Sequence, residues 1–485
     1  MSIKNGKEYI ERIDRQQINL WYNGQRVTGL ISEHPAFRGL IHTQADLYDM
    51  QCDAQFTHLM TYKSPHSGDP VGLSFLPPMN KRDLRRRRQM IDLWSKRHHG
   101  FLGRSPDYMN TVLMSLYTAA SILEENDPRY ASNLRSYYEY CRDNDITLSH
   151  AFVQPFASKW SAEADPVEDT IACKVIEVTG EGLIVSGAFV MATQGATCEE
   201  ILVLPTPSLT FSEEANPTAI AFAVPNDLDG MTFICRDSYA HDCTFDYPLS
   251  SRFDEMDTMV IFDKVLIPHN RVFLYGNETM GNRLFTEGNF LAHAGHQVVS
   301  RYIAKTEFFL GLIQNLAEEQ NVTLEMSTTQ QISRVMMLLE NLKGLRLASE
   351  AEAATDPMGY FTPKTSPLLA ACLQFPDFHM EITNMIQMMS SSNLIMSPSG
   401  ANLESDIQPY LENYLKGIFT TAKERVALFR LAWELGAGPF GGRQNQYELF
   451  FLGNQKMISS RLYNLFPNQD EYKNLVTDFL QNNKA

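Results

Sequence analysis

Residues 174–187, KVIEVTGEGLIVSG, carry the clearest structural signal in the chain. Val, Ile and Leu dominate both halves of this stretch, and Gly180 and Gly182 lie between them, which is typical of a β-hairpin. Further short β-rich runs with turn residues between them follow at 201–204, 219–224, 232–235 and 259–267. Several strands at this spacing predict a compact β-barrel or sandwich in the middle of the chain.

Helical periodicity flanks the β-rich middle on both sides. Before it, apolar residues recur at three- and four-residue spacings over 83–95 and 109–125, and Asn126-Asp127-Pro128 marks a helix stop. After it, the same spacing returns over 296–319, 330–353, 380–389 and 420–435. The order of helices, strands and helices predicts an α+β fold, with functional sites where the units meet.

This layout predicts three domains. We expect an N-terminal helical domain over residues 1–150, a middle β-barrel domain over 151–278 and a C-terminal helical bundle over 279–485.

The composition narrows the class of function. The chain has 485 residues, with 41 Lys and Arg against 57 Asp and Glu, so its formal net charge is −16. Such a surface repels phosphate backbones and anionic lipids, so we expect neither nucleic acid nor a membrane as a partner. No apolar run approaches the ~18 residues of a membrane helix, and the amino end lacks a signal-peptide pattern. Seven scattered cysteines without a C-x-x-C pair predict reduced thiols and a cytoplasmic protein.

The first candidate for a functional motif is GRSPDYMN, residues 103–110. It reads as a loop that enters a helix, because Pro is tolerated in the first helical turn. Arg104 and Tyr108 are four residues apart, so both side chains can point into one cleft. A guanidinium and a phenol together can hold an oxyanion or a phenolic oxygen. The alternative is an ordinary helix start with a surface arginine.

Two further candidates lie at the edges of predicted strands. His150 stands in TLSHAFVQP, residues 147–155, and a histidine there can accept a proton near neutral pH. The alternative is a core histidine whose ring nitrogens are satisfied by neighbours. The stretch MATQGAT, residues 191–197, could place backbone amides and the Thr193 hydroxyl against the edge of a flat ring, or could be a plain connection.

A glycine-rich stretch, GAGPFGGR over residues 436–443, formally contains G-x-G-x-x-G. It follows a helical segment and includes Pro439, so we reject a dinucleotide-binding strand–turn–helix. A glycine-rich turn with Arg443 can still bind a pyrophosphate through free amides and positive charge.

A basic run at 81–88 could guide a phosphate-bearing cofactor or an acidic partner, or could be one solvated helix face. The pairs His98-His99 and His293…His296 lack the H-E-x-x-H pattern and a nearby cysteine, so we expect no metal site.

Taken together, these motifs resemble one family over nearly the whole chain. RSPDYMN at 104–110 and FGGRQ at 440–444, with Tyr447-Glu448 beyond it, are specific in combination. The chain resembles the FADH2-dependent 4-hydroxyphenylacetate 3-monooxygenases, the large oxygenase components of two-component phenol hydroxylases. The strand VIFDKVLIP at 260–268 is also similar to the middle domain of acyl-CoA dehydrogenases, whose overall fold this family shares.

The resemblance implies roles for particular residues. Arg104, Tyr108 and His150 would be catalytic and would surround the phenolic oxygen, and a loop with Thr206 and Ser208 would cover the substrate. The residues expected at the flavin are His150, Phe152, Gln154, Phe156, Lys159, Thr193, Gly441, Gly442, Arg443 and Gln444. The implied cofactor is FAD, delivered as FADH2 by a separate NAD(P)H:flavin reductase, and the other reactants are O2 and a small aromatic substrate. The resemblance also implies a homodimer or homotetramer with an oligomerisation tail in the C-terminal bundle.

Some positions depart from the family pattern. Pro155-Phe156-Ala157-Ser158-Lys159 stands where the family has P-Q-V-[DN]-R, and Leu449 stands where it has arginine. These changes leave open a different aromatic substrate or an amine nitrogen, and a scaffold without catalysis. The sequence as a whole leaves open the choice between FAD and FMN. A related flavin-binding lyase, 4-hydroxybutyryl-CoA dehydratase, would need cysteine ligands for an iron–sulfur cluster, and Ser300 stands where one is expected.

Overall fold

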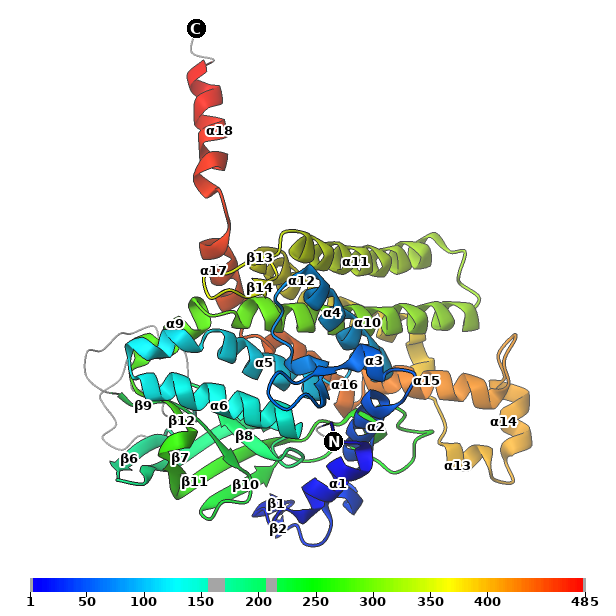
Figure 1. Ribbon diagram of the computed structural model, residues 1–485. Helices are drawn as coiled ribbons and strands as arrows, with labels where there is room; N and C mark the ends of the chain where they lie inside the picture. The colour runs from blue at the N-terminus through cyan, green and yellow to red at the C-terminus, as the bar shows by residue number, and fades with distance from the viewer. Residues whose placement is uncertain (1–2, 156–170, 206–215, 483–485) are drawn as a thin grey trace.

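A computed structural model describes residues 3–155, 171–205 and 216–482 (Figure 1). Helices, a strand-rich middle and further helices follow one another along the chain, which confirms the predicted α+β fold. Within the described residues, no helix combines the length and the apolar character that crossing a membrane requires.

The amino-terminal part is mainly helical. Its helices are α1 (Gly6–Arg15), α2 (Arg38–Cys52), α3 (Thr57–Met60), α4 (Lys81–Arg97), α5 (Pro106–Thr118) and α6 (Pro128–Asn144). A small hairpin joins β3 (Thr61–Lys63) to β4 (Pro70–Gly72). The predicted stop at 126–128 is also a helix start, because the Asp127 side chain caps α6 and Pro128 takes its first position.

The basic run lies on α4, and its residues differ in burial. Arg87 is buried and donates to the carbonyls of Ser74 (2.6 Å) and Leu76 (3.0 Å). Lys81, Arg82 and Arg85 are exposed. The run is therefore partly a solvated face and partly an anchor for the loop that precedes α4.

The strands of the middle region form two sheets. The six-stranded sheet has the order β2 (Gln25–Arg26), β1 (Leu20–Tyr22), β10 (Met231–Cys235), β11 (Asp257–Pro268), β7 (Gly182–Thr193), β6 (Lys174–Val178). The four-stranded sheet has the order β12 (Val272–Gly276), β9 (Asn216–Pro225), β8 (Glu200–Val203), β5 (Leu148–Ala151). The predicted hairpin at 174–187 is the antiparallel pair β6–β7.

The two sheets pack face to face, and within the described residues they do not close into one barrel. The rings of Phe222 on β9 and Phe262 on β11 meet edge to face across the interface, with centroids 5.7 Å apart. The expected β-barrel domain is thus corrected to a sandwich, the other arrangement that the strand spacing left open. The sequence pattern did not predict β5 and β12 as strands. These two strands pair with β8 and β9 and so complete a separate second sheet.

The four-stranded sheet is the middle layer of the molecule. Along β8, Ile201 and Val203 face the other sheet, whereas Leu202 between them faces the helical core. This alternation follows from the two-residue repeat of a strand with both faces buried. Helices α5 and α6 cover the helical side of this sheet (Figure 1).

The carboxy-terminal part is a helical bundle. Its helices are α9 (Glu278–Thr286), α10 (Phe290–Glu319), α11 (Met326–Ala351), α12 (Thr365–Ser390), α13 (Gly400–Leu403), α14 (Gln408–Leu415), α15 (Ala422–Gly436), α16 (Pro439–Phe450), α17 (Gln455–Leu465) and α18 (Gln469–Asn482). The short helix α8 (Ser250–Phe253) lies earlier in the chain, between β10 and β11, and packs against α2. A two-stranded ribbon, β13 (Ala354–Thr355) and β14 (Phe361–Thr362), links α11 to α12. In Figure 1, α10, α11 and α12 pack side by side, and α18 projects away from the rest.

One β-sheet contains strands from both the first and the second predicted domain. Strand β1, in the first predicted domain, pairs in parallel with β10 of the second, with Leu20 opposite Phe233. The division at residues 150 and 278 stays a prediction.

Candidate active site

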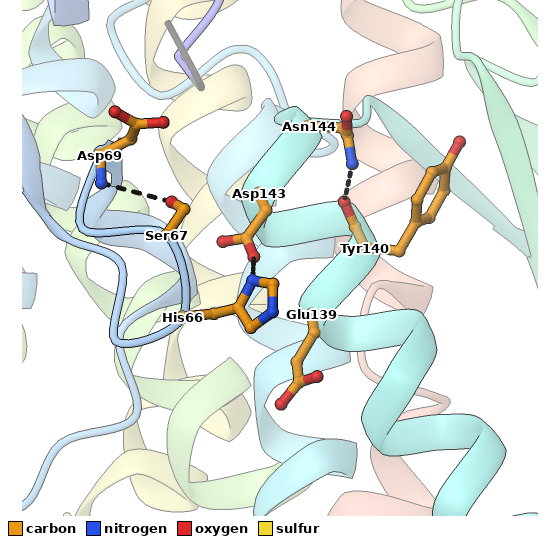
Figure 2. A pocket seen from close by; sticks show the side chains of 7 residues that line it. All are labelled: His66, Ser67, Asp69, Glu139, Tyr140, Asp143 and Asn144. Atoms are coloured by element: carbon orange, nitrogen blue, oxygen red, sulfur yellow. Dashed lines mark hydrogen bonds and ion pairs between the residues drawn. The ribbon is translucent and has the colours of Figure 1, made fainter.

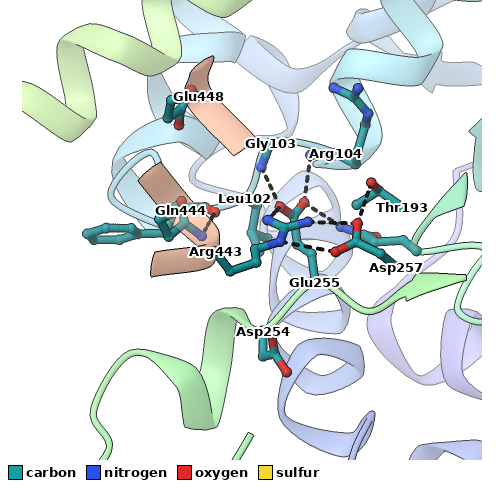
Figure 3. A network of polar contacts seen from close by, with 12 residues as sticks. Leu102, Gly103, Arg104, Thr193, Asp254, Glu255, Asp257, Arg443, Gln444 and Glu448 are labelled. Atoms are coloured by element: carbon teal, nitrogen blue, oxygen red, sulfur yellow. Dashed lines mark hydrogen bonds and ion pairs between the residues drawn. The ribbon is translucent and has the colours of Figure 1, made fainter. Parts of the chain in front are cut away.

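A buried carboxylate fixes the loop that carries Arg104. Glu255 accepts hydrogen bonds from the backbone N–H groups of Gly103 (3.0 Å) and Arg104 (2.7 Å), as Figure 3 shows. Helix α5 begins two residues later, with Pro106 in its first turn as expected. Arg104 itself is 7% exposed, so the alternative of a surface arginine at an ordinary helix start is wrong.

Aromatic rings surround the Arg104 guanidinium. Its Cζ lies 4.2 Å from the ring centre of Phe451, 4.4 Å from that of Tyr108 and 5.5 Å from that of Tyr447. Its Nε and Nη1 are buried and have no hydrogen-bond partner among the described residues. The side chain therefore keeps donors that a ligand could use.

His150 reaches the same place from the four-stranded sheet. Strand β5 pairs in parallel with β8, which sets His150 opposite Leu202. The imidazole stacks on Phe152 at a centroid distance of 5.1 Å and lies 6.2 Å from the Tyr108 ring. Its Nδ1 is buried without a hydrogen-bond partner in the described part of the chain, so His150 is not a satisfied core histidine.

Thr193 is brought to this site by the other sheet. The chain beyond β5 bridges the end of β7, where the Val190 N–H donates to the Val153 carbonyl (2.9 Å). Nearby, the Ser149 hydroxyl donates to the Thr193 carbonyl (2.7 Å). The structure thus gathers the predicted residues of three separate segments at the place where the two sheets and α5 meet.

Burial sets the protonation states at the site. Burial, and then the charge of Arg104, lower the pKa of His150 well below its usual value. Burial raises the pKa of Tyr108, although Arg104 opposes this shift. At neutral pH the site therefore holds a neutral imidazole, a protonated phenol and one guanidinium.

Glu255 also joins the Arg104 loop to a second cluster of charges (Figure 3). Arg443 donates to Asp257 Oδ1 (2.9 Å) and to Glu255 Oε2 (3.2 Å), and the Thr193 hydroxyl also donates to Asp257 (2.7 Å). Burial alone would raise the pKa of Asp257, but the charges of Arg443 and Arg236 hold it well below its usual range. The guanidinium of Arg443 is therefore used within the protein, and its role toward a pyrophosphate stays a prediction.

The remaining predicted flavin residues are placed as follows. Gln444 accepts from Lys305 Nζ (2.7 Å), and Gln154 accepts from the Cys173 N–H (3.0 Å). A Cβ at Gly441 would stand 2.3 Å from the Leu435 carbonyl oxygen, whereas Gly442 has open space. Residues Phe156, Lys159, Thr206 and Ser208 lie outside the described residues.

The glycine-rich stretch at 436–443 joins two helices, α15 and α16. This context agrees with the rejection of a dinucleotide-binding strand–turn–helix.

Several residues at the site were not predicted from the sequence. Tyr447 and Phe451 supply two of the rings around Arg104, and Glu255 and Asp257 anchor the loop and Thr193. The sequence signal for the acids was their place just before the strand at 259–267. The aromatic pair has the four-residue spacing of one helix face, which resembles ordinary core packing.

A separate hollow lies between the β3–β4 hairpin and the end of α6 (Figure 2). It has a volume of about 410 Å³ and is lined by His66, Ser67, Asp69, Glu139, Tyr140, Asp143 and Asn144. None of the predicted site residues lines it, and His66 Nδ1 pairs with Asp143 at 3.3 Å.

A solved structure with low sequence identity has the same overall fold as this chain. An oxygen-tolerant archaeal 4-hydroxybutyryl-CoA dehydratase from N. maritimus superimposes with a TM-score of 0.87 over 99% of this chain and 95% of that chain, at 19% identity. At this identity the likeness shows the fold alone.

Family models and closer relatives identify the family. The models "4-hydroxyphenylacetate 3-hydroxylase N terminal" and "C terminal" match residues 5–274 and 281–481, so the chain belongs to the 4-hydroxyphenylacetate 3-hydroxylase family. A probable 4-hydroxyphenylacetate 3-monooxygenase of Bacillus subtilis is 39% identical over 99% of each chain. The oxygenase component of a 4-hydroxyphenylacetate 3-monooxygenase, solved with FAD and 4-hydroxyphenylacetate, is 36% identical with a TM-score of 0.92, over 99% of this chain and 98% of that chain.

Proposed function

We propose that this protein is the oxygenase component of a two-component, flavin-dependent monooxygenase. It adds a hydroxyl group ortho to the hydroxyl of a phenol such as 4-hydroxyphenylacetate, using FADH2 and O2. The observation that carries this proposal is the set of buried, unpaired polar atoms at one place: Arg104 Nε, Arg104 Nη1 and His150 Nδ1. A buried polar atom without a partner costs about 1–3 kcal/mol, so several together indicate that a ligand supplies the partners.

The three side chains have different roles toward the phenol. The neutral imidazole of His150 accepts the phenolic proton at Nδ1, and the electron pair of the broken O–H bond stays on the oxygen. Arg104 stabilises the resulting phenolate by charge and by its free N–H groups, and Tyr108 stays protonated beside it. The phenolate pushes electron density to its ortho carbon, which becomes the nucleophile.

The chain offers suitable contacts for a flat cofactor next to that phenol. The stacked rings of His150 and Phe152 and the Thr193 segment line one side, and Gly442 leaves open space near Arg443. Reduced FAD, when bound, supplies the electrons that activate O2. The protein orients the substrate ring and excludes water from the reaction.

The proposal includes partners. A separate NAD(P)H:flavin reductase supplies FADH2, in line with the "oxygenase component" name of the solved relative. We place the reaction in the cytoplasm, where the seven cysteines, all free within the structure, stay reduced. A homodimer or homotetramer is supported by the projecting α18, whose Leu475, Val476 and Leu480 are 68%, 61% and 59% exposed.

The test is product analysis by mass spectrometry. The purified protein is supplied with FAD, NADH, any flavin reductase, isotopically labelled O2 and a panel of simple phenols that includes 4-hydroxyphenylacetate. We expect one labelled oxygen atom in an ortho-dihydroxy product. If hydrogen peroxide is the only product of O2 with every phenol, and no phenol binds, the proposed function is wrong.

A further inference from the structure

Arg104 has surroundings that differ from those of the other buried arginines near the site. Arg443 and Arg301 each lie over an aromatic ring, but each also pairs with a carboxylate, Arg443 with Asp257 and Arg301 with Glu448. Arg104 is in no ion pair with any described residue, and aromatic faces take the place of the carboxylate. Its charge is therefore held in place without being neutralised.

Phe451 is the closest wall of this cage, which we define as the rings of Tyr108, Tyr447 and Phe451. Its ring contacts Arg104 (4.2 Å) and also Arg301 (4.7 Å). Tyr108 and Tyr447 each meet Phe451 edge to face, with centroids 5.2 and 5.3 Å away. The three rings thus support one another, and two of them come from the end of α16 in the C-terminal bundle.

A glycine makes room for the third wall. A Cβ at Gly103 would stand 2.2 Å from Cε1 of the Tyr447 ring, which real atoms do not tolerate. Because Gly103 directly precedes Arg104, the ring of Tyr447 can pack against the loop that carries the guanidinium.

A carboxylate that could neutralise Arg104 is close by. Glu255 accepts the backbone N–H of Arg104 at 2.7 Å, and it also accepts hydrogen bonds from the Gly103 N–H, Arg443 and Gln194. The guanidinium nevertheless lies over the aromatic rings rather than on Glu255.

We propose that Phe451 is a positioning residue for the hydroxylation: as part of the aromatic cage it holds the Arg104 guanidinium away from Glu255, so that the full positive charge faces the phenolic oxygen. This inference rests on the proposed function and names a residue of the C-terminal bundle that acts through Arg104. Without the ring, Arg104 turns to Glu255 and the site loses much of its preference for a phenolate.

The experiment uses the FAD-loaded protein and 4-nitrophenol, whose phenol and phenolate forms absorb differently. Difference spectra over a pH series give the apparent pKa of the bound phenol. The variants are Phe451→Leu and Phe451→Met, which remove the ring and keep apolar volume, so either one that folds suffices. Phe450→Leu is the matched control, because this neighbour is 54% exposed and lies outside the cage. Arg104→Gln removes the charge itself.

We expect the wild-type protein and Phe450→Leu to lower the pKa of the bound phenol equally. Loss of the ring in Phe451→Leu or Phe451→Met should raise that pKa by about one unit, toward the value in Arg104→Gln, at unchanged FAD affinity. If the Phe451 variants match the wild type while Arg104→Gln does not, the cage has no positioning role. If the wild-type protein binds the phenol with an unshifted pKa, or not at all, the proposed Arg104 site itself is wrong, and the inference with it.

Discussion

In the C-terminal bundle, Arg301 and Lys305 share the carboxylate of Glu448, whereas Arg104 is buried with no carboxylate partner among the described residues. We call the first cluster closed because a carboxylate pairs with both of its cations: Arg301 binds Glu448 through two N–H groups at 2.6 and 2.8 Å, and Lys305 adds a third contact at 2.7 Å. We call the Arg104 cluster open because its guanidinium keeps N–H donors without a partner among the described residues.

The difference separates a structural site from a ligand site. Burying a charge costs several kcal/mol unless partners compensate for it. Where the chain supplies a counter-charge, as Glu448 does, the cluster joins α10 to α16, although Arg301 Nε has no hydrogen-bond partner among the described residues. Where the chain leaves a buried charge without a counter-charge, as at Arg104 beside the unpaired His150 Nδ1, the missing partner is the substrate that we propose.

The largest expected effect is on the closed cluster. Burial opposes ionisation of Glu448, but Arg301 and Lys305 hold its pKa well below the usual range. Glu448→Gln leaves both cations buried without a counter-charge, so we expect the free energy of unfolding to fall by about 3–5 kcal/mol. Urea unfolding followed by circular dichroism measures this.

The matched control is an exposed pair, Lys473 and Asp470, at 2.9 Å. Asp470→Asn should leave the stability nearly unchanged, because water screens an exposed ion pair. Equal effects of the two substitutions would contradict the distinction between the two kinds of charge cluster.

The open cluster should respond in the opposite way to loss of its charge. Arg104→Gln removes an uncompensated buried cation, so stability should not fall. Product formation should drop by roughly 10²–10³-fold, because the phenolate loses its counter-charge. Titration with FAD serves as the control, because it shows whether the variant still binds the cofactor. If the variant loses stability but keeps its turnover, Arg104 is a structural residue and does not belong to a ligand site.

A lower pH should reduce the stability of the fold, because the Arg301 cluster and the Arg104 site each hold a neutral histidine next to a cation. Burial, followed by the charge of Arg301, lowers the pKa of His98 to about 3. Histidine in the unfolded chain titrates near ~6.5, so below that pH the unfolded state binds a proton that the folded state refuses. Stability should therefore fall as the pH drops from ~6.5 toward ~3, by about 2 kcal/mol per such histidine at pH ~5.

Unfolding in urea at pH ~7 and pH ~5 measures this dependence. The variant is His98→Asn, because the Asn amide oxygen can still accept the Leu102 N–H that His98 Nδ1 accepts at 3.3 Å. Its loss of stability between the two pH values should be smaller by the contribution of one histidine. Stability that stays constant or rises between these pH values would show that these histidines are already charged in the fold.

The smallest expected effect is at Tyr447, which lies on α16 between the two regions. Its hydroxyl is buried and has no hydrogen-bond partner in the described part of the chain. Tyr447→Phe keeps the ring over Arg104 and loses no hydrogen bond, so stability should change by less than about 1 kcal/mol. A loss above about 2 kcal/mol in thermal unfolding would mean that the hydroxyl is paired after all.

What the sequence predicted well were local features. Periodicity located the helix at 296–319 inside α10 and the hairpin at 174–187, because both depend on residues that are close in sequence. Strand β1 was missed, although Asn23-Gly24 joins it to β2 in a local hairpin; its other partner, β10, lies more than two hundred residues away.

The site shows the same limit. Spacing suggested that Arg104 and Tyr108 point to one place, and the structure brings them together with His150. The ion pairs of Arg443 and the packing of Phe451 on Arg104 join residues from distant segments, and no local pattern reveals such contacts. Arg443 therefore looked free for a pyrophosphate in the sequence, although Asp257 and Glu255 neutralise it.

The most direct test is a crystal structure of the protein with FAD and 4-hydroxyphenylacetate. We predict that the phenolic oxygen lies within about 3.2 Å of a free nitrogen of Arg104 and of His150 Nδ1, which fills the vacant hydrogen bonds of both side chains. A complex in which the phenol binds elsewhere, while the guanidinium keeps only its aromatic contacts, would contradict the account.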